Sequence, residues 1–439
     1  MTNIVLIGAG SVEFTQILLS DLVELPELID STVTLHDIDA ERLDTAERIA
    51  HLINNAAGTE LRIRATLDRR SALDGADFVV NEIQVGGLEA TLRDFEIPKA
   101  HGLRQTIADT IGVGGIFRGL RTIPVLVAIA QEMTELCPDA MLLNYANPMA
   151  MLPWAVWEGT GLKRAIGLCH SVQNTHEQLA ALVDVPVGEI EFVTAGLNHQ
   201  AFVLRFERDG ENLYPLLDAA IAADPDGLGR RVRIEIYRRF GFFPTESSEH
   251  SAEYVPWFMR HDDQRDRYRI PVDEYVRRSL ENIDEYTETR RRLSTGTPLP
   301  IEGEDELAPR YIHAMLTGES RIEYGNVRND GLIDNLPAGS CVEVPCRVDG
   351  EGIHPIAIGA LPTQCAALNR TFLNVVELTV RAALEQRRDH VYQAVLLDPN
   401  AAATLTVDEI RAMVDELIEA HGELLPAGIR DSRKVVRRS

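Results

Sequence analysis

Short apolar runs alternate with amphipathic segments over the first 170 residues of the chain. The runs are rich in Val, Ile and Leu, and Asn3 to Ile7 is the first of them. The pattern predicts strands at 3–7, 32–35, 77–84, 141–144 and 165–168, and helices at 14–25, 40–55, 115–136 and 148–157. Strands that are apolar throughout and alternate with helices indicate an α/β fold with a Rossmann-type, doubly wound parallel sheet.

The pattern changes near residue 190. Residues 191–194 and 200–207 have the pattern of antiparallel strands, and the charged stretches near 228–240 and 272–292 have that of helices. Thr406 and Glu409 form a capping-box pattern that opens a further helix. One apolar face of that helix predicts a contact with the core or with another subunit, through Ile410, Met413, Val414, Leu417 and Ile418. We therefore expect a Rossmann domain at 1–195 and a C-terminal mixed α+β domain at 196–439.

Composition and charge narrow the class of protein. The chain has 439 residues, of which 45% are hydrophobic and 25% charged, as is typical of a soluble globular protein. No uninterrupted apolar run approaches the roughly 20 residues that span a bilayer, so we expect no membrane partner. A formal net charge of −25 argues against nucleic acid as a partner, because it repels phosphate backbones. The start of the chain has no basic signal-peptide region, and we expect a cytoplasmic protein.

A glycine-rich turn follows the first predicted strand. Gly8 and Gly10 match the first two glycines of the dinucleotide-binding fingerprint, and Ser11 follows at the start of the next helix. Glu13 replaces the third glycine. Asp37 ends the second strand, where its carboxylate would accept hydrogen bonds from ribose hydroxyls and favour NAD over its 2′-phosphorylated form. The order of strand, turn, helix, strand and acid favours this over an ordinary glycine turn capped by Ser11.

More polar residues follow the later strands at the same edge of the predicted sheet. Gln84 ends the third strand, Asn144 to Pro148 follow the fourth, and Cys169 and His170 follow the fifth. Open α/β sheets bind their ligands at the carboxyl ends of the strands. We therefore expect these residues to converge on the nicotinamide of a bound NAD.

Cys169 and His199 are candidate metal ligands. A cysteine needs a neighbouring cation or metal to be a thiolate at neutral pH, and His199 follows a glycine turn from which it can supply a second ligand. The alternatives are a cysteine that acts as a small hydrophobe and a histidine satisfied in the core, since the spacing matches no zinc template. The chain has an odd number of cysteines, which argues against a disulfide framework: 137, 169, 341, 346 and 365.

Two further segments combine acids with residues suited to close ligand approach. Residues 105–115 form a loop with one acid, Asp109, and glycines before a helix; the alternative is that Asp109 merely caps that helix. Residues 245–254 concentrate titratable groups, including His250 and Tyr254, and the alternative there is a solvated charged face.

Together these residues resemble the signatures of glycoside hydrolase family 4, the NAD- and metal-dependent glycosidases with a lactate/malate dehydrogenase-like fold. The resemblance spans nearly the whole chain, with the motifs in order. They are Gly8-Ala9-Gly10-Ser11, Asp37-Ile38-Asp39, 107–115, Asn144-Tyr145-Ala146-Asn147-Pro148, Cys169-His170-Ser171-Val172, Asn198-His199 and 324–331. Cys169 to Val172 and residues 245–250 are similar to the α-galactosidase (melibiase) branch. The resemblance also implies a homodimer or homotetramer, with substrate, metal and subunit contacts in residues 196–439.

The mechanism that the resemblance implies is hydrolysis of α-galactosides without net redox change. NAD⁺ removes a hydride from the sugar C3, a base removes the C2 proton, and a divalent metal at the C2 and C3 oxygens stabilises the charge that develops. The C1 leaving group is eliminated, water adds, and the hydride returns. The expected metal is Mn²⁺, although affinity alone would favour zinc beside a thiolate.

The resemblance assigns roles to single residues. Cys169 and His199 match the metal ligands, and Asn147 matches a residue that contacts the substrate hydroxyls beside the cofactor. Asp109 falls where relatives carry an acid near the substrate and the metal. His170 is expected to contact the sugar and, as a hypothesis, to protonate the leaving group.

The base at C2 has several candidates. Relatives use a tyrosine, which we place at Tyr254. An alignment of Phe242-Phe243 with that tyrosine is also possible, and it leaves His250 or Glu249 as the base.

Three other functions share part of this pattern. An α-glucuronidase, an α-galacturonidase or another acidic-sugar glycosidase of the same family competes, because the sequence does not show which basic groups face the sugar C6. An NAD-dependent hydroxyacid dehydrogenase shares the fold but predicts stoichiometric NADH. A catalytically idle NAD-binding sensor is the third, and the acidic surface and the absence of a DNA-binding motif argue against it.

Overall fold

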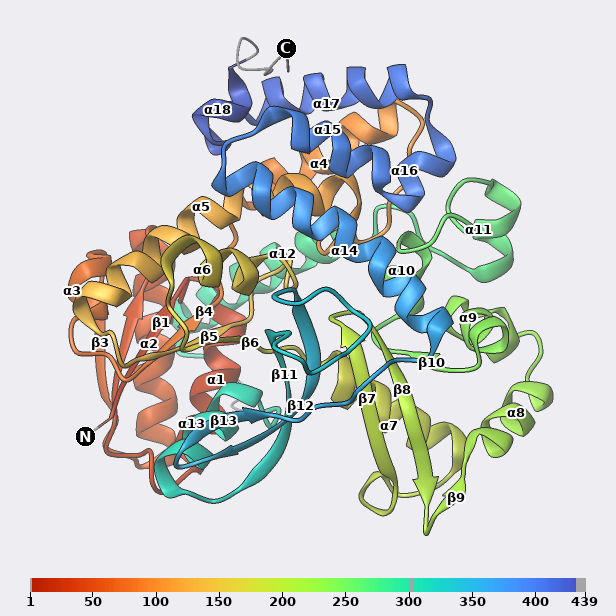
Figure 1. The fold of residues 1–439 in the computed structure, drawn as a ribbon. Coiled ribbons are helices and arrows are strands. Elements are labelled where there is room, and N and C mark those ends of the chain that lie inside the picture. The colour runs from red at the N-terminus through yellow and green to blue at the C-terminus, as the bar shows by residue number, and fades with distance from the viewer. Residues whose placement is uncertain (1, 300–302, 432–439) are drawn as a thin grey trace.

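The computed structural model describes residues 2–299 and 303–431, and one continuous sheet forms its centre (Figure 1). Six parallel strands lie in the order β3-β2-β1-β4-β5-β6, which is that of a dinucleotide-binding Rossmann sheet. They are β1 (Asn3–Ile7), β2 (Thr32–His36), β3 (Arg62–Thr66), β4 (Phe78–Asn81), β5 (Met141–Asn144) and β6 (Ala165–Gly167). The predicted fold class is therefore confirmed.

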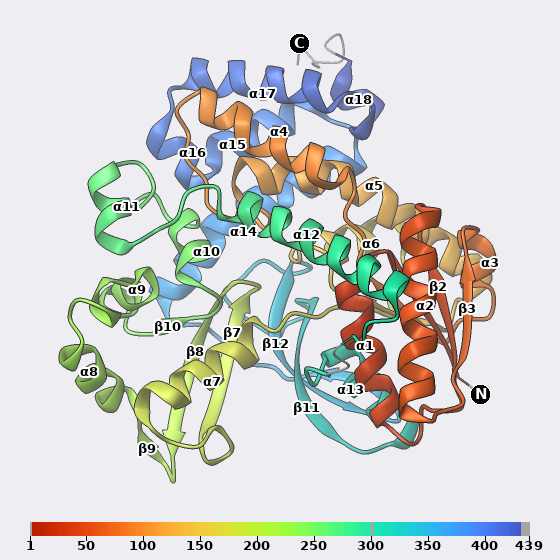
Figure 2. The same cartoon turned by 180° about the vertical axis from the view of Figure 1, so that it is seen from behind.

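Helices cover both faces of the parallel strands. On the face turned toward the viewer in Figure 2, α1 (Val12–Glu24) packs beside α2 (Ala40–Ala57). On the other face α5 (Gly112–Leu136) packs against α6 (Leu152–Thr160) and the short α3 (Arg69–Leu73). This arrangement leaves the carboxyl ends of the strands free to carry the site.

Helix α5 is long and apolar enough to cross a membrane by length and composition alone, with a mean hydropathy of 1.5. However, 72% of its most apolar stretch is buried inside the fold, and so are its two arginines, Arg118 and Arg121. In the described part of the chain it is the one helix that meets this criterion. Helix α5 is therefore a helix of the protein core.

Antiparallel strands extend the sheet beyond β6. The join is made by β11, whose Asn326 pairs with Gly167, and the order continues β11-β12-β7-β8-β10. The added strands are β7 (Glu191–Leu197), β8 (Gln200–Arg208), β9 (Glu211–Asn212), β10 (Phe243–Pro244), β11 (Arg321–Arg328), β12 (Cys341–Asp349) and β13 (Gly352–Pro355). The antiparallel pair predicted at 191–207 is confirmed as β7 and β8.

The remaining helices are α4 (Gly87–Ala100), α7 (Ser171–Val183), α8 (Tyr214–Ala223), α9 (Val232–Phe240), α10 (Ser248–Glu253), α11 (Asp262–Tyr268), α12 (Glu274–Thr295), α13 (Leu307–Thr317), α14 (Thr363–Leu384), α15 (Arg388–Leu397), α16 (Pro399–Thr404), α17 (Val407–His421) and α18 (Ala427–Arg430). Most of them surround this second half of the sheet or close the top of the molecule in Figure 1, whereas α13 packs against α1, and α12 packs against α4 and contacts α2. Short 3₁₀ turns lie at Val187–Glu189, Leu228–Arg230 and Gly422–Leu424. The capping box of Thr406 and Glu409 opens α17 as predicted, and the apolar face of α17 is buried in the core.

Some element boundaries differ from the expected ones, for local reasons. The edge strand β3 escapes a search for apolar runs because it alternates arginines with apolar residues. Helix α4 begins within the glycine pair 86–87 and contains Pro98, and both residue types have low helix propensity. The strand expected at 77–84 ends at Asn81, and the helix expected from Pro148 begins at Leu152. Before it, the Asn147 side chain accepts a hydrogen bond from the Met149 amide at 3.2 Å, a local turn that competes with helix.

Candidate active site

The turn after β1 has the close packing that a dinucleotide site needs. Gly8 has a φ of +94°, and a Cβ there would lie 3.0 Å from the backbone of Glu82. A Cβ on Gly10 would lie 2.5 Å from Oδ2 of Asp37. That same oxygen accepts a hydrogen bond from the Gly10 amide at 2.8 Å, so Asp37 sits directly beside the turn. The residues present fit the diphosphate and ribose of a dinucleotide.

The other cofactor candidates lie around this turn. Ser11 is exposed at the start of α1 and makes no side-chain capping bond, so the turn is not held by a Ser11 cap. Gln84 follows β4 and donates to the Thr91 hydroxyl at 3.4 Å. Next to it, Val85 accepts a hydrogen bond from the buried Arg121 at 2.9 Å, which fixes the loop that faces the turn.

Three donor atoms from separate elements gather beyond the end of β6. Sγ of Cys169, a nitrogen of His199 and a carboxylate oxygen of Glu246 all lie within 4.8 Å of one another. The distance from Sγ to Nε2 of His199 is 3.2 Å, and that from Nε2 to Oε2 of Glu246 is 3.7 Å. Thiolate, imidazole and carboxylate form a donor set for a first-row divalent metal. The structure thus brings the two predicted ligands together and adds Glu246.

The orientation of His199 suits a metal ligand. The Thr110 hydroxyl donates to Oδ1 of Asp109 at 2.8 Å, so its oxygen is left to accept from Nδ1 of His199, also at 2.8 Å. A proton on Nδ1 leaves the Nε2 lone pair aimed at Cys169 and Glu246. Burial lowers the pKa of His199, but Cys169 and Glu246 outweigh it and raise this pKa to about 10. The negative groups that attract a proton here would equally attract a divalent cation.

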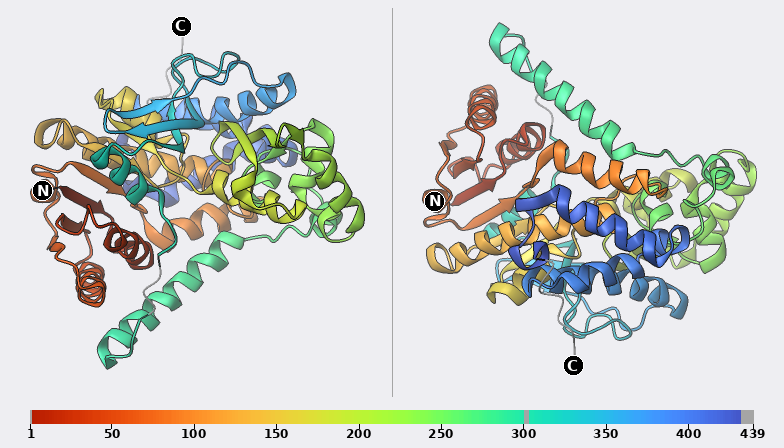
Figure 3. Two further views of the ribbon diagram at one scale, coloured as in Figure 1. Left: turned by 90° about the horizontal axis from the view of Figure 1, so that it is seen from below. Right: turned by 90° about the horizontal axis from the view of Figure 1, so that it is seen from above.

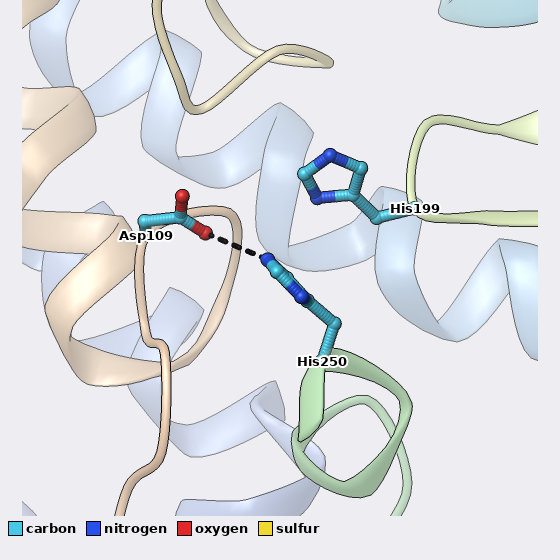
Figure 4. Close-up of side chains that lie close together, drawn as sticks. All are labelled: Asp109, His199 and His250. Atoms are coloured by element: carbon cyan, nitrogen blue, oxygen red, sulfur yellow. Dashed lines mark ion pairs between the residues drawn. The ribbon is translucent and has the colours of Figure 1, made fainter. Parts of the chain in front are cut away.

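Asp109, His199 and His250 form an adjoining cluster (Figure 4). Oδ1 of Asp109 lies 3.4 Å from Nε2 of His250, and its Oδ2 accepts a hydrogen bond from Nδ2 of the Asn147 side chain at 2.9 Å. Burial raises the pKa of Asp109, but His250 and Arg118 outweigh burial and hold it well below its ordinary value. Asp109 is therefore a carboxylate between Asn147, a predicted substrate contact, and His250, a candidate base, and it does not cap α5, which begins three residues later.

Tyr254 lies in the same cluster. Its hydroxyl is 3.4 Å from Nδ1 of His199, and the side chain is 3% exposed. Burial and the Asp109 carboxylate raise the pKa of Tyr254 well above its ordinary value of 10. Of the two other candidates for the base, His250 belongs to this cluster and Glu249 is half-buried on α10. Phe243, from the alternative alignment, packs in a separate apolar cluster around α9.

His170 faces a carboxylate that no sequence motif contained. Its Nε2 lies 2.8 Å from Oε2 of the buried Glu306, and its ring stacks on that of Tyr145. Burial lowers the pKa of His170, but Glu306 outweighs burial and raises it above the ordinary value. Glu246, by contrast, lies inside segment 245–254, which the sequence marks by its concentration of titratable groups. The sequence does not single out Glu246 there as a metal ligand.

The comparisons with known proteins agree with this geometry. Models of the family 4 glycosyl hydrolases match residues 3–185, and models of their C-terminal domain match residues 194–401. The chain belongs to the family 4 glycosyl hydrolases. It is a glycoside hydrolase on a Rossmann-type sheet, as its strand order already indicated.

Similar proteins cover almost the full chain of this family 4 enzyme. An α-galactosidase of Bacillus subtilis (strain 168) is 43% identical over 97% of this chain and 99% of its own length. An α-galactosidase of Rhizobium meliloti (strain 1021) is 37% identical over 97% of this chain and 89% of its own. A 6-phospho-α-glucosidase from gut microorganisms, solved in complex with NAD and Mn²⁺, has a TM-score of 0.82 at 22% identity and covers 97% of this chain and 99% of its own. At that identity the structural likeness establishes the fold.

Glu253 holds the Asp109 loop of the family 4 enzyme in place. It is 2% exposed, and its carboxylate accepts hydrogen bonds from the amides of Thr106, Ile107 and Ala108 at 2.5, 3.3 and 2.9 Å. Burial nevertheless raises the pKa of Glu253 from 4.5 to about 8. Below about pH 8 the protonated form of Glu253 is thus favoured in the folded protein.

The raised pKa of Glu253 predicts a pH-dependent stability. The protonated Glu253 carboxyl adds to the free energy of unfolding. This stabilisation is fully present below about pH 4.5 and is lost as the pH rises through about 8. Because a glutamine side chain does not titrate, we expect the unfolding free energy of the native protein to fall relative to that of Glu253→Gln over this interval, by a few kcal/mol in order of magnitude. Urea titrations at several pH values measure the difference. Glu60→Gln, at an exposed carboxyl, is the control, and a difference for Glu253→Gln that is constant with pH would contradict the expectation.

Proposed function

We propose that this enzyme hydrolyses α-galactosides with the help of NAD and Mn²⁺. The observation that carries the proposal is that the cluster of Cys169, His199 and Glu246 lies at the same sheet edge as the turn of Gly8 and Gly10. The two α-galactosidase relatives, at 43% and 37% identity, support the substrate. The similar structure solved with NAD and Mn²⁺ supports both cofactors.

The residues present divide the work of the reaction. When bound, NAD⁺ would accept and return a hydride at the sugar C3, and the metal would polarise the neighbouring hydroxyls. Asp109 and the Asn147 amide, which are hydrogen-bonded to each other, bind and orient those hydroxyls. Burial of the cluster excludes bulk water, which strengthens each of these electrostatic contacts.

Proton transfer is assigned to two residues on opposite sides of the cluster. Tyr254 takes the C2 proton, since its hydroxyl lies 3.4 Å from a metal-ligating histidine. Burial and Asp109 raise the pKa of Tyr254, and a divalent metal held by Cys169, His199 and Glu246 would counter this by favouring the phenolate that the role requires. His170, which is partly exposed and is held by Glu306, donates a proton to the departing oxygen.

The setting of the enzyme completes the proposal. We assign a domain boundary near residue 195, which the limits of the two family models, at 185 and 194, support. We also propose a cytoplasmic homodimer or homotetramer without nucleic-acid or membrane partners. The net charge of −25 supports the absence of a nucleic-acid partner.

An activity assay tests the function directly. Purified protein is given aryl α-galactoside, aryl α-glucuronide or aryl α-galacturonide, with NAD⁺, Mn²⁺ and a thiol reductant each supplied or withheld. We expect release from the galactoside alone, dependent on all three additions, without net formation of NADH. Release without NAD⁺ would rule out the mechanism. Faster release from a uronide would show that the natural substrate is an acidic sugar, and stoichiometric NADH would indicate a dehydrogenase.

The same assay in D₂O tests proton removal at C2. The released sugar is expected to carry deuterium at C2, because the abstracted proton exchanges with solvent. Tyr254→Phe should lower both turnover and exchange by about 100-fold or more, the usual effect of removing a general base. His250→Gln, at the competing residue, serves as the comparison, and a larger loss of exchange in that variant would transfer the role to His250.

A further inference from the structure

Strand β12 carries a buried carboxyl group that the proposed reaction does not use. Glu343 is 1% exposed, and β12 lies between β7 and β11, where it joins the Rossmann strands to the hairpin of β7 and β8 (Figure 3). Its Oε1 accepts hydrogen bonds from the side-chain amides of Asn198 at 3.1 Å and of Asn326 at 3.2 Å. Both partners are neutral, and burial of a carboxyl group among neutral partners costs free energy. A local cost of this kind is typical of residues that serve a functional site.

The first of these amides belongs to the turn that carries His199. The hairpin of β7 and β8 turns through two residues, Asn198 and His199. His199 has a φ of +65°, in the left-handed region that residues other than glycine adopt rarely and at a cost in free energy. Such a conformation persists only where the surrounding structure holds it, and the hydrogen bond from Asn198 to Glu343 is one such restraint.

The second amide lies next to the segment that carries Cys169. Asn326 on β11 pairs with Gly167, the last residue of β6, and its side chain also donates to the Gly167 carbonyl at 3.3 Å. One amide group therefore bridges Gly167 and Glu343, and Cys169 follows two residues after Gly167. A chain of hydrogen bonds thus runs from the Cys169 segment through Asn326 and Glu343 to the turn of His199.

The two predicted metal ligands need such a link because they lie in different parts of the sheet. Cys169 follows the Rossmann strand β6, whereas His199 lies in the antiparallel extension. A metal site requires fixed separations between its ligands, and Sγ of Cys169 lies 3.2 Å from Nε2 of His199. The Thr110 hydroxyl orients the ring of His199, and the link through Glu343 adds a restraint on the backbone of its turn.

We propose that Glu343 is a positioning residue of the metal site, whose Oε1 holds the Asn198 and Asn326 amides together and so fixes the turn of His199 against the Cys169 segment. The inference rests on the metal site of the proposed function and adds a residue that acts through two amides rather than as a ligand. Residues that orient metal ligands in this way typically contribute a factor of about 10 to 100 in metal affinity.

Removal of the shared acceptor tests the link. Glu343→Leu leaves both amides without it, and Mn²⁺ should bind about 10-fold or more weakly, as measured by isothermal titration without substrate. Burial raises the pKa of Glu343 to about 7, so a glutamine resembles the protonated form of the native side chain. Glu343→Gln keeps a carbonyl oxygen at this position and should restore nearly native Mn²⁺ affinity. Native affinity in Glu343→Leu, or an equal loss in both variants, would overturn the proposal, whereas native protein that binds no Mn²⁺ would overturn the metal site itself.

A second buried carboxylate separates this effect from a general loss of stability. Glu323 on the neighbouring strand β11 is 2% exposed and pairs with Arg310. Glu323→Leu leaves Arg310 without that partner, so it should lower the free energy of unfolding in urea but leave Mn²⁺ affinity native. If Mn²⁺ affinity fell as much in Glu323→Leu as in Glu343→Leu, the loss would come from the stability of the sheet and the proposal would be wrong.

Asn198→Ala tests the link from its other end, with Glu343 and His199 in place. It removes one of the two amides, and Mn²⁺ should again bind about 10-fold more weakly. Asn400→Ala is the control, since Asn400 is also buried and its amide donates to the Arg104 carbonyl at 2.9 Å. When Asn198→Ala and Glu343→Leu are combined, the loss should be smaller than the product of the two single losses, because both changes break the same link. Losses that multiply in full would overturn the proposal.

Discussion

A Cys169→Ser enzyme is expected to lose nearly all glycosidase activity and to bind Mn²⁺ at least about 100-fold more weakly. The reason is the donor set: Cys169 supplies the sulfur that lies within 4.8 Å of the His199 and Glu246 donor atoms. A serine hydroxyl stays protonated at neutral pH, so it brings no negative charge to the site. Isothermal titration with Mn²⁺ measures the affinity, and kcat/KM on aryl α-galactoside measures the loss of activity.

The matched control for this change is Cys137→Ser. Cys137 is also a free cysteine, but it is buried at the carboxyl end of α5, away from the cluster, so activity and Mn²⁺ affinity should stay native. NAD affinity should also stay native in Cys169→Ser, since the cofactor turn is formed by β1 and β2. A Cys169→Ser protein that lost Mn²⁺ but kept its full activity would show that the cluster is not catalytic.

The parallel half of the fold was predictable because each of its inner strands and helices has a hydrophobic pattern that is visible within a short stretch of sequence. β1 and β5 are short, mostly apolar runs, and β2 alternates threonine with valine and leucine. All three are buried along nearly their whole length, and each is followed by a helix of clear periodicity. The edge strand β3 was missed because its residues are partly exposed to solvent and need not be apolar. The join of β11 to β6 was beyond prediction, since more than 150 residues separate the paired residues Gly167 and Asn326.

The site was predictable to the extent that it follows strand ends. Cys169 could be placed beside the cofactor turn because both lie at carboxyl ends of one parallel sheet. His199 follows β7, and the sequence offered it as a possible second ligand beside Cys169. The convergence of the two is a tertiary contact, which strand ends alone do not determine. Nothing in the sequence indicated that Glu306 belongs to the site. It lies just before α13 and outside any recognisable motif, and the packing of α13 beside α1 brings it to His170.

Gly10→Ala is expected to weaken NAD binding by about 10- to 100-fold. The added Cβ would lie 2.5 Å from Oδ2 of Asp37 and 2.8 Å from Cβ of Arg42, closer than such atoms approach, so the Asp37 carboxylate must move. The displaced Asp37 carboxylate would lose its hydrogen bond from the Gly10 amide and would no longer be oriented toward the ribose hydroxyls. Hydrogen bonds to a charged group contribute about 1.5–3 kcal/mol, which corresponds to that loss of affinity.

The readout for Gly10→Ala is NAD affinity itself, by titration in the absence of substrate, because a loss of activity alone would not distinguish cofactor binding from damage to the metal cluster. Mn²⁺ affinity should remain native, since Cys169 and His199 lie on other elements. Gly188→Ala is the matched control: a Cβ there meets no atom within 4 Å, and its NAD affinity should be unchanged. If Gly10→Ala bound NAD as the native protein does, the turn after β1 would not be the dinucleotide site, and the glycosidase would need a different position for its hydride acceptor.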